Sequence, residues 1–449
     1  MRAASAITSI ALVVSVLLPC AQVLADEVST TAPVVQWYAP FLSGGGYCSE
    51  AISFVGAVDN VKSPLFSLRI TQHGDSVNPS FSTTLPTDIQ ALFRSHWFTS
   101  PSATPPTIAI CHSEPGAWNP PRYQTSLCPP QGTEYAIGRT MFETDRLPSG
   151  WAQRMDDIMD EIWVPTMFAK SIFEAAGVPP NKVVVVPEAI DVEFFDPDTA
   201  TPLPIDGITE ATTVFLSIFK WEERKGWKSL LKAYLAAFSR ADDDVVLVLL
   251  TNAYHSSSDF ASLVERFALD TTEGRSMDEL PRIHILPPNL PQDQLPALYK
   301  AATAFVLPSR GEGWGRPHVE AMAMALPIIA TFWSGPTEYM TLENSYPLDI
   351  EGLVPVESGA FQGHLWAEPS VPHLKALMRH VVLHPEVPGS TNIPHATLLW
   401  CVGGEDERTT GKTRHDSALC AVRRRGYGRG GHRRCVGFPR CTLRRVVVA

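Results

Sequence analysis

Two glutamates, Glu312 and Glu320, are separated by seven residues in a segment whose chemistry suits a phosphorylated sugar. An apolar run over residues 304–307 predicts a strand, a loop with three glycines follows it, and Pro317 opens a predicted helix. The unpaired N–H groups at the start of that helix favour an anion. Carboxylates only accept hydrogen bonds, so the two glutamates suit sugar hydroxyl groups. The same residues also fit a solvated loop followed by an ordinary amphipathic helix.

Three cations, Lys220, Arg224 and Lys225, follow another apolar run earlier in the chain. The segment 214–234 predicts a strand, a loop that carries all three cations, and a helix with one apolar face. Lysines on loops are usually solvated surface groups. Preorganised cations can also stabilise negative charge that develops during a reaction more than they stabilise the ground state.

Together the two segments resemble the retaining glycosyltransferases of family 4, which have the GT-B fold. The resemblance rests on the two glutamates in the context EGWGRPHVEAMA and on the spacing of five residues between Lys220 and Lys225. A third segment, PEAIDVEFFDP, retains the family's aspartate as Asp191. In that segment Glu188 and Ala189 replace the asparagine-glycine pair that is usual in the family.

The resemblance implies a role for each position of the candidate site. Glu320 would hold the ribose hydroxyls of the nucleotide, and Glu312 would contact the donor hexose. The two lysines would be catalytic, because breaking the bond between the sugar and the nucleoside diphosphate builds negative charge on the departing diphosphate, which they would stabilise. Gly335 and Thr337, in the turn WSGPTE, would lie near the phosphates. We expect no metal ion and no other cofactor, because the lysines and the helix end supply the positive charge.

A glycine-rich turn and a histidine are the candidates nearer the N-terminus. The strand predicted near residues 34–39 leads into three glycines that include Gly45 and Gly46, and Ser49 is expected to cap the helix that follows. Such a turn lets the backbone approach a ligand, although most glycine triplets are only flexible turns. His112 ends a short apolar strand, where ligands of parallel sheets gather, but a lone histidine is often structural. By the resemblance, the glycines would contact the substrate and His112 would lie near the donor sugar.

The chain of 449 residues is long enough for two domains, and its composition, 18% charged and 45% hydrophobic, is globular. We predict an N-terminal Rossmann-like domain on the acceptor side over residues 26–200. A C-terminal Rossmann-like domain over residues 205–386 would bind the nucleotide sugar. Short apolar runs alternate with helical stretches, which indicates the α/β class with parallel sheets. The strands expected in the second domain cover residues 245–250, 283–286, 304–307 and 328–331.

The two ends of the chain differ from its body. Residues 1–25, in which Arg2 precedes an apolar stretch, predict a secretory signal peptide. We therefore expect a protein of the secretory lumen or the extracellular space, with no membrane span after cleavage; an uncleaved anchor is the alternative interpretation of this stretch. Residues 387–449 contain twelve Lys or Arg and four Asp or Glu, without helical or strand periodicity. This composition predicts a disordered tail such as a shifted reading frame or an alternative exon would give.

Three of the eight cysteines, Cys48, Cys111 and Cys128, belong to the body of the chain. A bridge between Cys111 and Cys128 fits an oxidising compartment. Cys111 nevertheless ends an apolar run, so we expect a buried thiol instead. Three aspartates between residues 156 and 160 recur in a helical pattern, which indicates a solvated face and no metal site.

Two classes of function fit these observations. The first is a retaining glycosyltransferase that moves a hexose from a nucleoside-diphosphate sugar to an acceptor glycan or another hydroxyl compound. The second is a secreted glycan-binding or inactive GT-B protein, because the sequence after residue 387 lacks the terminal helix typical of the family. A basic tail could also bind nucleic acid or an acidic glycan, and the signal peptide argues against nucleic acid. Consumption of a nucleotide sugar distinguishes the first two classes.

Overall fold

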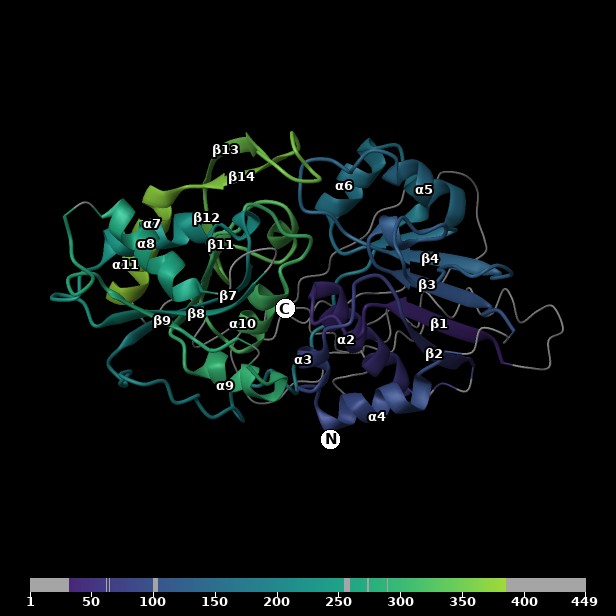
Figure 1. The fold of residues 1–449 in the computed structure, drawn as a ribbon, viewed down its shortest axis with the longest axis horizontal. Coiled ribbons are helices and arrows are strands. Elements are labelled where there is room, and N and C mark those ends of the chain that lie inside the picture. The colour runs from purple at the N-terminus through teal and green to yellow at the C-terminus, as the bar shows by residue number, and fades with distance from the viewer. Residues whose placement is uncertain are drawn as a thin grey trace, which may run out of the picture.

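Two α/β domains lie side by side, the first on the right and the second on the left of Figure 1. This computed structural model describes residues 32–384, apart from 62, 64, 100–103, 254–258, 273 and 289. The predicted signal peptide and the predicted tail lie outside the described residues. Within the described part of the chain, no helix has the length and apolar character needed to cross a bilayer.

The first domain is built on a parallel sheet of six strands in the order β2-β1-β3-β4-β5-β6. Its strands are β1 (Val34–Ala39), β2 (Ser67–Gln72), β3 (Ile108–His112), β4 (Tyr135–Arg139), β5 (Glu161–Val164) and β6 (Val183–Val185). Its helices are α2 (Gly46–Val61), α3 (Pro79–Ser82), α4 (Thr87–His96), α5 (Trp151–Ile158) and α6 (Met167–Ala175).

The second domain has another parallel sheet of six strands, in the order β12-β11-β10-β7-β8-β9. Its strands are β7 (Thr213–Trp221), β8 (Val245–Ala253), β9 (Arg282–Ile285), β10 (Ala304–Leu307), β11 (Ile328–Thr331) and β12 (Tyr346–Leu348). Its helices are α7 (Trp227–Ala237), α8 (Phe260–Thr271), α9 (Leu295–Lys300), α10 (Arg316–Ala323) and α11 (Val371–Leu383). An antiparallel hairpin, β13 (Ile350–Pro355) and β14 (Leu365–Pro369), extends from this domain toward α6 of the first (Figure 1).

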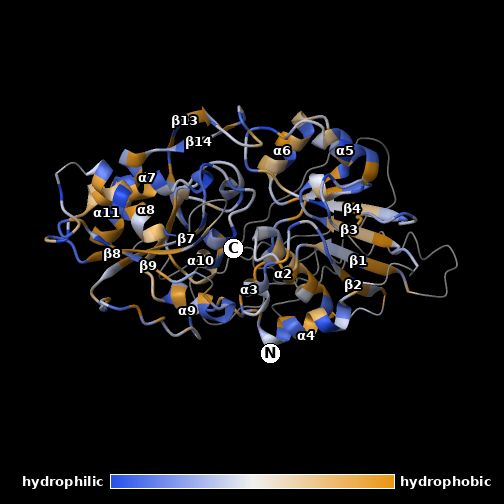
Figure 2. Cartoon of the chain, in the orientation of Figure 1, coloured by the Kyte–Doolittle hydropathy of each residue, from blue (hydrophilic) through white to orange (hydrophobic). Residues whose placement is uncertain are grey.

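The central strands are continuous apolar runs because helices cover both faces of a parallel sheet. Every residue of β3, β10 and β11 is buried. Figure 2 shows hydrophobic residues along most of β8, whereas the surface helix α4 alternates between hydrophilic and hydrophobic residues. The expected α/β class and the two facing Rossmann-like domains are therefore confirmed.

The strand orders of the two sheets predict where ligands bind. In the first sheet the direction of winding reverses between β1 and β3, and in the second between β7 and β10. Open parallel sheets bind ligands beyond the carboxyl ends of the strands at such a reversal. The loops that follow these four strands are therefore the expected site.

Three local expectations differ from the structure. Lys220 lies within β7 and not on a loop, because the ladder with β8 continues through Lys220 to Trp221. Helix α2 begins at Gly46, so Ser49 is an internal residue whose N–H donates to the carbonyl of Gly45 at 3.1 Å. Of the three aspartates expected on one helical face, Asp160 lies beyond the end of α5.

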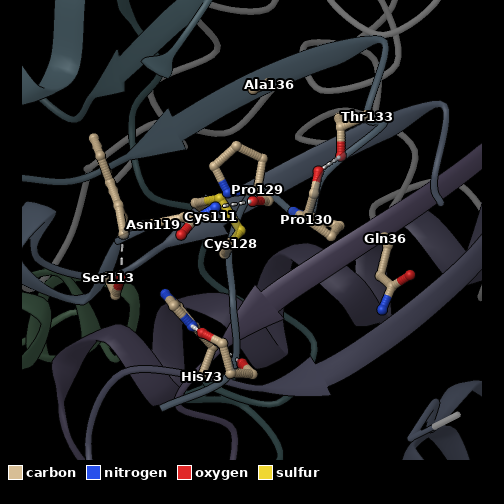
Figure 3. Close-up of a disulfide and its surroundings, with 12 residues drawn as sticks. Gln36, His73, Cys111, Ser113, Asn119, Cys128, Pro129, Pro130, Thr133 and Ala136 are labelled. Carbon is tan, nitrogen blue, oxygen red and sulfur yellow. Dashed lines mark hydrogen bonds between the residues drawn. A yellow bond between two sulfur atoms is a disulfide. The ribbon is translucent and has the colours of Figure 1, made fainter. Parts of the chain in front are cut away.

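The expectation of a buried Cys111 thiol was wrong, because Cys111 forms a disulfide with Cys128. Their Cα atoms are 5.6 Å apart, within the range that a disulfide spans. The loop after β3 returns to pass beside the strand end, which brings Cys128 next to Cys111 (Figure 3). Cys48 is a buried free thiol.

Candidate active site

Glu312 lies on the loop after β10 and is the centre of a group of charges. Its Oε1 is 2.7 Å and its Oε2 is 2.9 Å from Nζ of Lys225, while Nη1 of Arg224 donates to Oε2 at 3.0 Å. Burial acts to raise the pKa of Glu312, but Lys225 and Arg224 outweigh it and lower the pKa to about 2. Glu312 is therefore ionised at neutral pH, and it fixes both cations at the carboxyl end of the second sheet.

Lys220 ends near the first domain, where the two reversal points of the sheets meet. A Cβ atom added to Gly45 would lie 3.4 Å from Nζ of Lys220 and 3.7 Å from Oδ2 of Asp75. Burial lowers the pKa of Lys220, and the charge of Asp75 opposes this. Gly46 is exposed at the first position of α2, and no atom lies within 4 Å of a Cβ added there. The lysine thus faces the start of a long helix, an arrangement that suits an anion.

The turn that contains Gly335 and Thr337 is bonded to the loop of Glu312. The N–H of Gly335 donates to the carbonyl of Glu312 at 2.9 Å, and the N–H of Glu312 donates to Oγ of Ser334 at 2.9 Å. Gly335 must be glycine, because an added Cβ would come within 2.6 Å of the carbonyl oxygen of Gly313. Thr337 is exposed, and its hydroxyl donates to the carbonyl of Ser334 at 2.7 Å.

Glu320 is buried in α10, the helix that follows the loop of Glu312. Its Oε2 accepts a hydrogen bond from the hydroxyl of Tyr299 at 2.8 Å, and its Oε1 lies 3.4 Å from Nε of Arg316. Burial raises the pKa of Glu320, while Arg316 and the bond from Tyr299 oppose the rise. Tyr299 therefore orients one carboxylate oxygen, and the other faces the arginine.

His112 is placed differently from the other candidates, because it is completely buried and both ring nitrogens are bonded. Trp37 donates to Nδ1 at 3.2 Å, so the proton is on Nε2, which lies 2.8 Å from Oε2 of Glu50. Burial lowers the pKa of His112, against the charge of Glu50. Arg139 donates to the other oxygen of Glu50. In this structure His112 is part of a buried network beneath the site, and its contact with a donor sugar stays a prediction.

Sequence reasoning did not assign a role to several charged residues at the domain boundary. Arg224 adjoins Lys225, and its Nε lies 3.4 Å from Oε1 of Glu143, which follows β4 of the first domain. Arg316 adjoins the predicted helix start and also contacts the first domain. Adjacency to the motifs was the only signal for both arginines. Within the described residues, no group of three or more His, Cys, Asp or Glu could hold a metal ion.

The chain is similar to known glycosyltransferases in sequence and in fold. Residues 210–355 match the family model described as glycosyl transferases group 1. The chain is 25% identical over 239 residues to the D-inositol 3-phosphate glycosyltransferase of Acidothermus cellulolyticus, a match that covers 51% of this chain and 49% of that protein. It is 29% identical over 196 residues to the Corynebacterium glutamicum protein of the same name, with 42% of each chain covered. The chain thus spans about half the length of these curated relatives, or less.

Two solved structures share the fold. One is the Anabaena protein HepE in complex with UDP and glucose, with a TM-score of 0.52, 12% identity, and coverage of 78% of this chain and 90% of that one. The other is a glycosyltransferase from Rickettsia africae, with a TM-score of 0.53, 14% identity, and coverage of 80% and 90%. The protein therefore has the GT-B fold. The match of residues 210–355 to the glycosyl transferases group 1 model is compatible with the resemblance carried by the two motifs, and assignment to family 4 in particular stays a prediction.

Proposed function

We propose that this protein is a retaining glycosyltransferase that moves a hexose from a nucleoside-diphosphate sugar to a hydroxyl group of an acceptor. One observation carries the proposal. Lys220, Lys225 and Glu312 converge at the carboxyl ends of β7 and β10, the reversal point of the sheet in a group 1 domain. That place is where a GT-B protein would hold the diphosphate of its donor.

The chemistry follows from the charges. The bond between C1 of the hexose and the diphosphate breaks, and negative charge develops on the departing phosphate oxygen. Lys220 and Lys225 stabilise this charge in a site with little water. The acceptor oxygen forms the new bond to C1, and its proton passes to the departing diphosphate. Glu320 holds the ribose, and Glu312 keeps Lys225 in place while it contacts the hexose.

The comparisons suggest which compounds to test first. HepE was solved with UDP and glucose, so a UDP-hexose is the first donor. The curated relatives are named for D-inositol 3-phosphate, so this compound belongs in the acceptor panel together with neutral glycans. The Cys111–Cys128 disulfide supports a site of action in an oxidising compartment, either the secretory lumen or the extracellular space.

A donor panel tests the proposal. The full chain is incubated with UDP-, GDP- and ADP-hexoses and the acceptor panel, and release of the nucleoside diphosphate is measured. One donor should be consumed in an acceptor-dependent way. If the chain consumes none of the donors but binds glycans, it is the glycan-binding GT-B protein of the second class.

A further inference from the structure

Arg316, the first residue of α10, crosses the boundary between the domains. Its Nη2 donates to Oγ of Ser53 in α2 at 2.6 Å, and its Nη1 donates to the carbonyl of Ala189 at 3.0 Å. The same Nη1 lies 3.6 Å from Oε2 of Glu188. The Arg316 side chain is only 12% exposed, so these bonds are shielded from water and from salt.

The Nε edge of the same guanidinium faces Glu320, the residue predicted to hold the ribose. Arg316 precedes Glu320 by one helical turn, and its Nε lies 3.4 Å from Oε1 of Glu320. This Nε is buried and makes no hydrogen bond among the described residues. Tyr299 already occupies Oε2 of Glu320, so Oε1 is the oxygen shared between Arg316 and any hydroxyl that Glu320 accepts.

The two acceptors of Arg316 in the first domain are joined by a network of hydrogen bonds. Helix α2 carries Glu50 as well as Ser53, and Glu50 accepts hydrogen bonds from Arg139 of β4. Arg139 also donates to the carbonyl of Val186 at 2.6 Å, three residues before Ala189. Arg316 is therefore linked by hydrogen bonds, directly or through Glu50 and Arg139, to α2, to β4 and to the connector that leaves the first domain.

The connector is also where the sequence departs from its family, because Glu188 and Ala189 stand where an asparagine-glycine pair is usual. Glu188 is buried beside the guanidinium, and the charge of Arg316 opposes the rise that burial causes in its pKa. Ala189 thus supplies a carbonyl group and Glu188 a carboxyl group, and both groups face Arg316.

We propose that Arg316 is a positioning residue that links nucleotide binding at Glu320 to closure of the two domains. The proposal rests on the proposed function, in which Glu320 accepts hydrogen bonds from the ribose. A ribose hydroxyl at Oε1 fixes Glu320 and the first turn of α10, and thereby holds Arg316 in the geometry that reaches Ser53 and Ala189. By thermodynamic reciprocity, closure of the domains also prepares Glu320 for the nucleotide.

Hydrogen exchange of the full chain, with and without UDP, GDP or ADP, tests this coupling. In the wild type, the nucleotide that binds should slow exchange in α10, around Ser53 in the middle of α2, and in the connector 186–190. In Arg316→Ala the protection around Ser53 and in the connector should be lost, whereas protection at the start of α2, which would face the diphosphate directly, should remain. We expect nucleotide affinity and kcat to fall roughly tenfold, because two hydrogen bonds from a charged donor are lost. Arg316→Lys retains one donor group and should restore part of both.

Arg379→Ala is the matched control. Arg379 donates to Asp243 at 2.6 Å and to the carbonyl of Ala237 at 3.4 Å, both within the second domain, so this variant should keep the protection of α2. Wild-type protection around Ser53 and in the connector in Arg316→Ala, or none there in the wild type when nucleotide is bound, overturns the coupling alone. Failure of all three nucleotides to bind the wild type would overturn the proposed function and the coupling with it.

Discussion

The ammonium group of Lys225 lies 2.7 Å from Oε1 and 2.9 Å from Oε2 of Glu312, although 87 residues separate them in the chain. This pair joins the two sequence motifs at adjacent strands, β7 and β10. The glutamate predicted for the hexose therefore also orients the lysine predicted for the diphosphate. Loss of either residue should disturb both functions.

Replacement of the candidate residues should abolish most transfer without unfolding the protein. Lys225→Ala and Glu320→Ala each remove a charged partner of the donor, which commonly costs about 3 kcal/mol of transition-state stabilisation, or about a hundredfold in rate. Transfer rates and far-ultraviolet circular dichroism check both points. Lys228→Ala is the control, because Lys228 pairs with Glu223 at 2.7 Å on the surface and should leave the rate unchanged. Wild-type turnover in Lys225→Ala would refute the site.

Transfer should survive EDTA. In the proposed function, the positive charge that faces the diphosphate would come from Lys220, Lys225 and the start of α2, and a chelator does not affect these groups. The measurement is the transfer rate before and after dialysis against EDTA. Complete loss of activity that manganese restores would show that a metal ion carries the charge instead.

Gly311→Ala should disturb the contact between the two domains and lower the stability of the protein. An added Cβ would overlap the carbonyl oxygen of Glu143, a backbone atom of the first domain that cannot rotate away. We expect a loss of about 1–3 kcal/mol in the free energy of unfolding, together with slower transfer. Gly56→Ala in α2 is the control, because an added Cβ there would lie 3.8 Å from the side chain of Leu92 in α4, an ordinary van der Waals contact. That variant should be neutral or slightly stabilised. Equal stability of the two variants would show that the domains do not touch here in solution.

Stability should fall as the pH decreases from about 6.5 to about 4. Burial lowers the pKa of His73 from 6.5 to about 4, against a hydrogen bond to the backbone of Ser126. Between these values the unfolded chain binds a proton that the folded chain does not. The free energy of unfolding therefore drops by about 1.4 kcal/mol for each pH unit in this window. Urea unfolding of His73→Asn at several pH values should show a shallower slope than the wild type, and an unchanged slope would contradict this assignment.

The sequence predicted the fold, and it placed the candidate residues of the second domain at strand ends, for a topological reason. Glu312 and Lys225 follow strands at the reversal point of a Rossmann-like sheet, so strand ends that are far apart in sequence converge. Their mutual contact required only that β7 and β10 be neighbours.

Other features depend on packing that no local pattern encodes. The contacts of Arg316 with Ser53 and Ala189 exist only once the two domains have docked. The disulfide of Cys111 depends on the return path of the loop after β3. His112 was assigned to the strand end correctly, but the direction of its side chain, into a buried network with Glu50, is set by the pleat and by the neighbouring helix α2.

The configuration of the new glycosidic bond tests the central claim most directly. The full chain is incubated with its donor and acceptor, and proton NMR records the anomeric signal of the product at early times, before any anomerisation. A retaining glycosyltransferase gives a product with the same anomeric configuration as the donor sugar, and this is the result we predict. A product with inverted configuration would contradict the retaining mechanism, and a donor signal that stays unchanged with every acceptor would contradict transfer itself.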